Sequence, residues 1–169
     1  MTEVPAYAKE FLERPGQPGA FGALMDEYAR AAADFCRVAE SIDPAAFAAE
    51  RPSRDPCTRS PRTVCLHVWS AGRRYSDYIR KARGLPFDER FEPDAAALAG
   101  PKDVRARVAE ALRYTEGALV GLPDTEEGTM KPLRFQVRWG PTYDPEMILE
   151  HAVVHLLRHR RQLERWERA

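Results

Sequence analysis

The stretch "ILEHAVVHLLRHRRQL", residues 148–163, belongs to a predicted helix and carries His151, His155 and His159 at strict four-residue spacing. Residues four apart on a helix lie on the same face, one turn above another. Two imidazoles at this spacing can bind one metal ion from successive turns. Catalytic zinc-type sites usually have three protein ligands and an open position. The chain has four histidines, so His67 is the remaining candidate for a third ligand.

The histidine row also has interpretations without a metal. It lies beside the arginine-rich segment "RHRRQLERWER", residues 158–168, which is compatible with a solvated helix face or a pH-sensitive patch. His67 alone could be a hydrogen-bonded core residue. The chain lacks the H-E-x-x-H, paired C-x-x-C and G-x-S-x-G motifs, which removes the usual competing sites. The spacing by itself leaves the metal and non-metal interpretations open.

Four helices of about 20 residues are predicted, an estimate consistent with the usual range of globular helices. Their expected ranges are 21 to about 41, 61 to about 83, about 102 to 120, and 145 nearly to the C-terminus. Ser60-Pro61 and Asp144-Pro145 each combine a capping residue with a proline in the first turn. The alternation "LRFQVRW" at 133–139 predicts one strand or an extended segment.

These helices predict an all-α fold, a four-helix bundle formed by residues 21–169 after an N-terminal arm, residues 1–20, with at most a short helix. A helix of this length spans about 30 Å, and about nine extended residues run back along it. The linkers 42–59 and 122–143 are both long enough for such crossovers, so an up-up-down-down order is possible. The linker after the second helix is also long, so length permits this order without requiring it.

The overall composition excludes several classes of partner. The 169 residues include 26 basic and 26 acidic side chains, so net charge attracts the chain neither to nucleic acid nor to an anionic membrane. No apolar run approaches the ~20 residues that span a bilayer, and the N-terminus does not resemble a signal peptide. Three cysteines without paired spacing fit a reducing compartment. We expect a cytoplasmic protein that binds neither nucleic acid nor membrane.

Two motifs resemble the DinB/YfiT-like family. The segment "HLLRHRRQL", residues 155–163, is similar to the H-x-x-x-H-R-x-Q-L signature in the last helix of that family, and "LHVWSAGRRYSDYI", 66–79, is similar to its first-ligand segment. The stretch "RWGPTYDPEMILEHAVVH", 138–155, resembles the lead-in to the last helix. The family has glycine where this chain has Arg161, and a histidine at the position of His151 is less usual. The resemblance covers about residues 20–168 in architecture.

The resemblance implies both a site and an activity. In the family, three histidines hold a divalent metal, commonly nickel or zinc, and they match His67, His155 and His159 of this chain. The implied fold is an up-up-down-down four-helix bundle. Characterised members include bacillithiol transferases and mycothiol-dependent maleylpyruvate isomerase. The implied function is therefore a metal-dependent transferase that activates a low-molecular-weight thiol against an electrophilic substrate.

Other functions fit the same ligands. One is a metal-dependent hydrolase that uses metal-bound hydroxide, and another is a non-catalytic metal or small-molecule binding protein, perhaps a homodimer. A carboxylate base beside the metal would favour hydrolysis, and Glu150 is the nearest acidic residue in sequence to His151. Both catalytic functions need an open metal position, so the sequence does not separate them strongly.

Weaker candidates for substrate contacts are Arg74, Tyr75, Trp139, Tyr143, His151 and Gln162. Arg74 could bind a carboxylate or extend to solvent, and Tyr75 could donate a proton or fill the core. Trp139 and Tyr143 could cover the pocket or anchor their loop. Gln162 could orient a metal ligand. The row from His151 to His159 spans two turns, about 12 Å, so one ion cannot bind both and only one adjacent pair can serve. The resemblance of "HLLRHRRQL" to the family signature implies that the pair is His155 and His159 and that His151 is a pocket-wall or capping residue.

Overall fold

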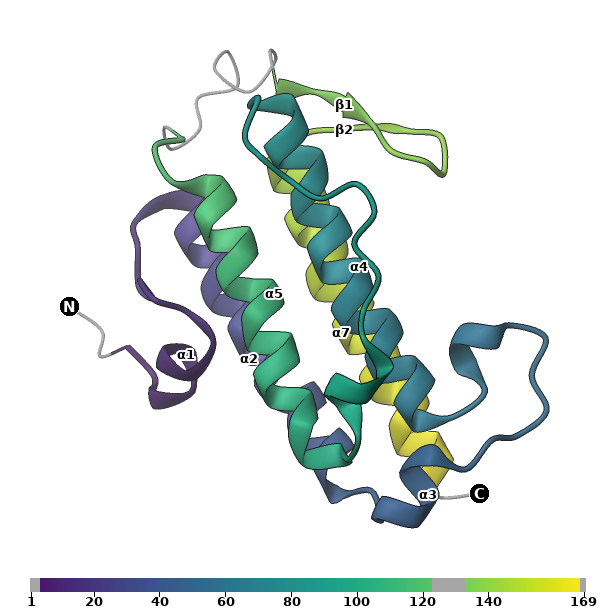
Figure 1. Ribbon diagram of the computed structural model, residues 1–169. Helices are drawn as coiled ribbons and strands as arrows, with labels where there is room; N and C mark the ends of the chain where they lie inside the picture. The colour runs from purple at the N-terminus through teal and green to yellow at the C-terminus, as the bar shows by residue number, and fades with distance from the viewer. Residues whose placement is uncertain (1–3, 123–132, 168–169) are drawn as a thin grey trace.

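The computed structural model describes residues 4–122 and 133–167, and these ranges are mostly helical, as the all-α prediction requires (Figure 1). The helices are α1 (Ala6–Phe11), α2 (Gly19–Ser41), α3 (Pro44–Ala48), α4 (Pro61–Ala82), α5 (Val104–Leu119) and α7 (Pro145–Glu167). Three short 3₁₀ turns are η1 (Pro56–Thr58), η2 (Ala95–Leu98) and η3 (Pro101–Asp103), and the strands are β1 (Phe135–Gln136) and β2 (Thr142–Tyr143). No helix within the described ranges is both long and apolar enough to cross a membrane.

Two of the long helices, α4 and α7, begin where the capping residues predict. At α4, Ser60 Oγ accepts from the Thr63 backbone N–H at 3.1 Å, and Thr63 Oγ1 accepts in return from the Ser60 N–H at 2.9 Å. This reciprocal capping box satisfies donors that the first helical turn leaves unpaired. At α7, Asp144 Oδ1 accepts from the Met147 N–H at 2.9 Å. The sequence therefore fixes where the two histidine-bearing helices begin.

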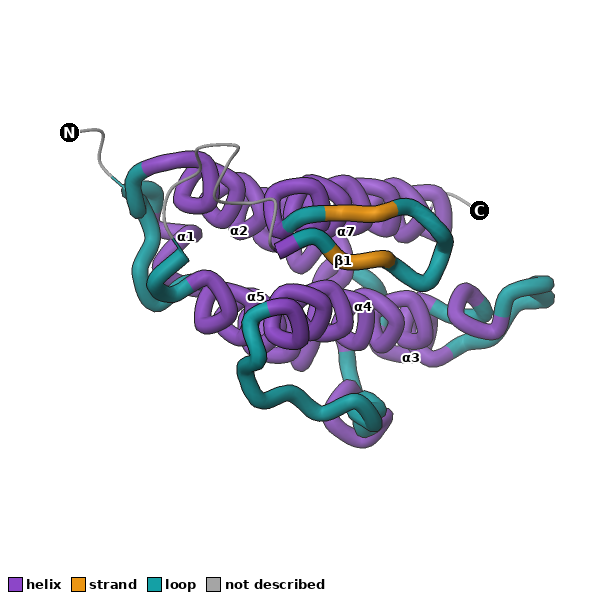
Figure 2. The backbone as a smooth tube through the Cα atoms, turned by 90° about the horizontal axis from the view of Figure 1, so that it is seen from above, coloured by secondary structure: helices purple, strands orange, loops and turns teal. Residues whose placement is uncertain are grey.

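The four long helices pack in two rows around a common core. Viewed from above, α2 and α7 lie in one row and α5 and α4 in the other (Figure 2). Large side chains that are fully buried fill the space between the rows: Phe35, Val64, Leu112, Leu149, Leu156 and Leu163. Burying each of these stabilises the fold by roughly 1.5–3 kcal/mol. The core holds α4 and α7 side by side, and the three predicted metal ligands lie on these two helices.

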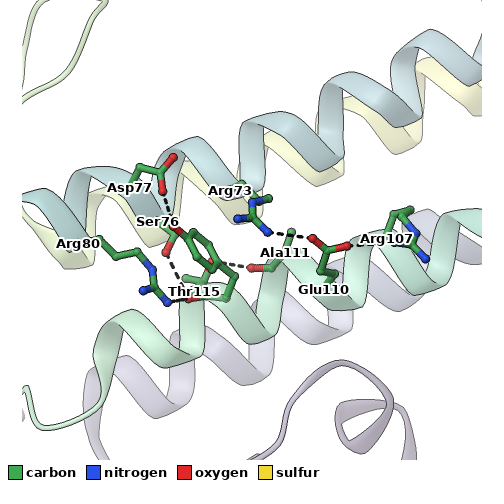
Figure 3. Close-up of polar contacts among 9 residues, drawn as sticks. Arg73, Ser76, Asp77, Arg80, Arg107, Glu110, Ala111 and Thr115 are labelled. Carbon is green, nitrogen blue, oxygen red and sulfur yellow. Dashed lines mark hydrogen bonds and ion pairs between the residues drawn. The ribbon is translucent and has the colours of Figure 1, made fainter. Parts of the chain in front are cut away.

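Polar contacts give the directions of the helices. Along α4 and α5, Arg73 pairs with Glu110 at 2.8 Å and, further on, Arg80 donates to the Tyr114 carbonyl at 2.9 Å, so the two helices are parallel (Figure 3). In contrast, Glu40 near the end of α2 accepts two hydrogen bonds from an arginine near the start of α5, Arg105, at 2.8 and 2.7 Å. Helices α2 and α5 are therefore antiparallel, and so are α2 and α4.

Helix α7 runs against α4 and along α2. His67 of α4 lies beside His159, late in α7, whereas Tyr75 lies beside His151, early in α7. Asp34 of α2 pairs with Arg160 of α7 at 3.4 Å, consistent with parallel directions. The order of the long helices is up-down-down-up, and the predicted up-up-down-down order is wrong.

The predicted topology is wrong because it placed crossovers in linkers 42–59 and 122–143, whereas the structure has one in the segment between α4 and α5. The segment 83–103, which joins the parallel helices α4 and α5, runs back along α4 (Figure 1). Linker 42–59 instead forms α3 and η1 on its way between the antiparallel helices α2 and α4. The linker before α7 lies partly outside the described residues. Because all three linkers exceed the length that a crossover needs, length could not select the topology.

The N-terminal arm packs against the main core. Ala8, Phe11 and Leu12 are buried there, and α1 contacts α2 and α5. Beyond α1, Glu116 of α5 accepts from the backbone N–H groups of Glu13 and Arg14 at 2.9 and 2.7 Å. Helix α1 is short, as expected, and its buried face makes the arm part of the same folded unit.

A small hairpin covers the end of α4 near the start of α7. Phe135 pairs with Tyr143 and Gln136 with Thr142, so the predicted extended segment is one arm of a two-stranded antiparallel sheet. Buried Val137 anchors the hairpin, and the Arg138 backbone N–H donates to the Tyr78 hydroxyl at 3.0 Å. The hairpin thereby places its tip beside α4.

Candidate metal centre

Three histidine side chains come together between α4 and α7. His155 Nε2 lies 3.0 Å from His67 Nε2 and 3.2 Å from His159 Nε2. The ring centroids of His67 lie 5.0 Å from those of both other histidines, and those of His155 and His159 are 4.4 Å apart. The predicted convergence of these residues is therefore observed.

Two of the three nitrogen-to-nitrogen distances in the cluster fit a single bound ion. Zinc–imidazole bonds are about 2.0–2.1 Å long, so nitrogens at right-angled to tetrahedral positions around one ion lie about 2.8–3.4 Å apart. The two distances from His155 Nε2 fall in this range, and the ligand atoms of all three residues lie within 4.8 Å of one another. The set contains only imidazole donors, which suit zinc, nickel and copper better than calcium or magnesium.

Gln162 orients one of these rings. His159 Nδ1 lies 2.8 Å from Gln162 Oε1, one turn further along α7. An amide oxygen can only accept, so Nδ1 carries the proton and donates, and Nε2 keeps its lone pair toward the other histidines. This is the arrangement expected of a ligand whose other ring nitrogen is fixed by a hydrogen bond.

The surroundings keep the cluster neutral. The side chains of His155 and His159 are only 7% and 4% exposed. Burial, reinforced by the neighbouring histidines and Arg158, lowers the pKa of His155 to about 2. Burial also lowers the pKa of His159 to about 4, although the Gln162 hydrogen bond opposes this shift. The pKa of the half-buried His67 is lowered mainly by burial. All three rings are therefore in the unprotonated form that metals bind.

A cavity of about 1110 Å³ opens beside the cluster and is lined by His67 and His155. Segments far apart in the sequence form its walls: η1, helix α4, the crossover after α4, the tip of the hairpin, and α7. A ligand in the cavity could thus reach two of the three histidines.

Aromatic side chains form one wall of this cavity. Trp139, at the hairpin tip, stacks on His151 with ring centroids 4.8 Å apart and an interplanar angle of 24°. Tyr75 contacts both His151 and His155, with centroids 5.1 and 5.4 Å away. Tyr143 does not line the cavity but packs against Trp139 at 5.8 Å. These rings give the entrance to the metal centre an apolar wall.

His151 lies outside the ligand cluster. Its ring centroid is 6.5 Å from that of His155, in a stacked arrangement, whereas the ligand rings are 4.4–5.0 Å apart. It lines the cavity between Trp139 and Tyr75. The structure places His151 on the cavity wall.

Two other predicted site residues also line the cavity. Arg74 is exposed and pairs with Glu92 of the crossover at 3.1 Å, so its guanidinium already has a carboxylate partner. Burial raises the pKa of Tyr75 to about 12, which keeps its hydroxyl protonated at neutral pH. Tyr75 is therefore a potential hydrogen-bond donor beside the cluster.

Several cavity residues were not among the predicted site residues. Arg158 lies three residues after His155 and seven after His151, so helical periodicity could have placed it on their face. Arg138 precedes Trp139 and could have been found as its neighbour. Asp55 and Cys57 reach the cavity through the fold of the linker between α3 and α4, and nothing in the local sequence indicates this.

No match was found for this chain among protein-family models, curated proteins or solved structures. The identification of the site rests on its geometry.

Proposed function

We propose that this chain is a DinB/YfiT-like protein that binds divalent zinc or nickel through His67, His155 and His159 and transfers a low-molecular-weight thiol to an electrophilic substrate. The observation that carries the proposal is the approach of three Nε2 atoms, with His155 Nε2 at 3.0 and 3.2 Å from the other two. The long helices α2, α4, α5 and α7 would form its four-helix bundle. Their up-down-down-up order differs from the order that the resemblance implied.

A divalent ion held by the three histidines would lower the pKa of a thiol bound beside it. The protein supplies the surroundings for this chemistry. Three neutral ligands leave the charge of the ion uncompensated, which favours an anionic partner such as a thiolate. Tyr75 and Trp139 line the cavity beside the cluster, and Gln162 fixes the ring of His159. An electrophile would have to enter by the same cavity.

Hydrolysis is the second candidate because one carboxylate lies on the cavity wall near the cluster. Asp55 lines the cavity, and its charge opposes the lowering of the His67 and His159 pKa values. Glu150, the acidic residue suggested by sequence proximity, is exposed and does not line the cavity. Asp55→Asn separates the two functions, because an amide still caps η1 at the Cys57 N–H but cannot act as a base. Loss of ester hydrolysis in Asp55→Asn would favour the hydrolase. Thiol transfer that is retained in the same variant would favour the transferase.

The direct test is metal analysis of the untagged protein, followed by a thermal-shift screen of small thiols with the loaded protein. We expect one zinc or nickel ion per chain and a rise in melting temperature with at least one thiol. A metal ion at a free concentration of about 100 times its dissociation constant would raise the free energy of unfolding by roughly 2.7 kcal/mol. His155→Ala serves as the control that loses both effects. An equal stabilisation by metal in both proteins would show that the ion binds elsewhere.

A further inference from the structure

Among the residues that the structure describes, four cationic side chains line the cavity, and two of them have no carboxylate partner there. Arg74 pairs with Glu92 at 3.1 Å, and Lys81 lies 3.8 Å from Glu89. For the other two, Arg138 and Arg158, no carboxylate of the described residues lies within ion-pair distance. The charge of these two guanidinium groups is therefore available to a ligand.

Both of these arginines line the cavity together with His67 and His155, although they come from different elements. Arg158 on α7 places Nη2 3.5 Å from His159 Nε2, and its charge lowers the pKa of all four histidines. The charge of Arg138, at the hairpin tip, lowers the pKa values of His67 and Tyr75, and so does the charge of Arg158. Both side chains therefore contribute positive charge to the lining of the cavity that includes His67 and Tyr75.

Metal binding would make this positive charge more unfavourable. The three ligands are neutral, so an ion would add its full charge next to Arg158. The positive charges of the ion and of Arg158 would repel each other at such a short separation. A bound anionic group would relieve the repulsion and accept hydrogen bonds from the planar guanidinium groups, which match carboxylates in bidentate geometry.

The acidic residues on the same wall limit the charge of such a ligand. Asp55, Asp77, Glu89 and Glu92 all line the cavity. Two of them are already paired with cations, but Asp55 and Asp77 lack an ion-pair partner among the described residues and would repel a dianion such as phosphate more strongly than a carboxylate. Trp139 and His151, which stack on each other, line the same cavity.

We propose that the cavity takes a thiol that also carries a carboxylate, with Arg158 and Arg138 holding the carboxylate while the sulfur faces the histidine cluster. This inference rests on the proposed function, because it names the chemical class of the thiol. It assigns both arginines a role in ligand binding that is independent of metal retention.

A matched pair of probes tests the proposal. We would titrate cobalt-loaded protein with 3-mercaptopropionate and with 3-mercaptopropionamide, which differ only in the charged group. Calorimetry would give both affinities, and the sulfur-to-cobalt charge-transfer absorption would report whether the sulfur reaches the ion. The variants are Arg158→Gln and Arg138→Gln. The control is Arg161→Gln, which removes an exposed charge from the same helix at a position that does not line the cavity. Metal content is measured for every protein.

We expect wild type and Arg161→Gln to bind the carboxylate at least about tenfold more tightly than the amide, a difference within the range of charge-assisted hydrogen bonds. This preference should fall toward unity in Arg158→Gln or Arg138→Gln while the metal content is unchanged. Equal affinity for the two probes, no binding of either, or a preference that survives in both variants would overturn the inference. A carboxylate preference without charge-transfer absorption would support the anion subsite and contradict the proposed thiol chemistry. Charge-transfer absorption with both probes at equal affinity would support the thiol chemistry and contradict the anion subsite.

Discussion

Gln162 Oε1 lies 2.8 Å from His159 Nδ1, and this contact fixes which nitrogen of His159 faces the cluster. Replacing Gln162 with leucine removes the acceptor, so the ring loses both its tautomer preference and its orientation. We expect zinc affinity to fall by roughly 10- to 100-fold, as is typical when the partner of a ligating histidine is lost. Competition with a chromophoric chelator would measure this change. Gln162→Glu keeps an acceptor and should retain the affinity, and equal losses in both variants would contradict the assigned role.

The histidine row gives a prediction about stoichiometry. His155→Ala and His159→Ala remove members of the cluster and should abolish stoichiometric metal, whereas His151→Ala should keep it because its ring lies on the cavity wall. Metal analysis of the three purified variants measures the outcome. Metal lost with His151 and kept without His159 would move the site one turn toward the start of α7.

The pH dependence of stability follows from the lowered histidine pKa values. In the metal-free folded protein, His155 and His159 stay neutral, with pKa values of about 2 and about 4. In the unfolded chain they take up protons below about pH 6.5. The unfolded state then binds more protons, so the free energy of unfolding decreases as pH falls from about 6.5 toward 4. Each such histidine contributes up to about 1.4 kcal/mol per pH unit.

Urea unfolding of the metal-free protein at a series of pH values would measure this slope. Carboxylates also titrate in acid, so the informative quantity is the difference between wild type and His155→Leu. We expect the variant to have a shallower slope as pH falls from about 6.5 toward 4, because this range lies between the unfolded histidine pKa of about 6.5 and the lowered pKa of about 2 for His155 in the folded protein. Identical slopes would show that His155 is not held neutral by the fold.

The buried carboxylate of Glu116 provides a prediction about the N-terminal arm. It is 7% exposed and accepts from the backbone N–H groups of Glu13 and Arg14. Glu116→Ala leaves these donors without their acceptor, so we expect the free energy of unfolding to fall by about 1–3 kcal/mol. Hydrogen exchange at the two amides should also accelerate.

Glu27→Ala is a suitable control for this change. Glu27 is exposed and forms an i,i+3 pair with Arg30 at 2.8 Å, and such surface pairs contribute about 0–1 kcal/mol. A loss of stability in Glu116→Ala no larger than in the control, with unchanged exchange at the two amides, would contradict the anchoring role.

Local chemistry explains which parts of the fold could be predicted. The starts of α4 and α7 follow from Ser60-Pro61 and Asp144-Pro145, because a cap and a first-turn proline act within a few residues. The four short elements α3, η1, η2 and β2 were not predicted individually, since segments of two to five residues carry little periodicity. The order of the long helices was predicted wrongly. Each of the three linkers between them is long enough to run back along a helix, so linker length could not select the order.

The sequence by itself determined that His155 and His159 share a helix face, because the period of the α-helix fixes the relation between residues four apart. It also determined that His151 and His159 cannot bind the same ion, because two turns separate them. Only the tertiary structure decided that His67 meets this pair, since the packing of α4 against α7 sets that distance. The same packing, with the folded linker and the hairpin, brought Asp55, Arg138 and Arg158 to one cavity. Contacts between distant segments depend on the buried core as a whole, and no local pattern encodes them.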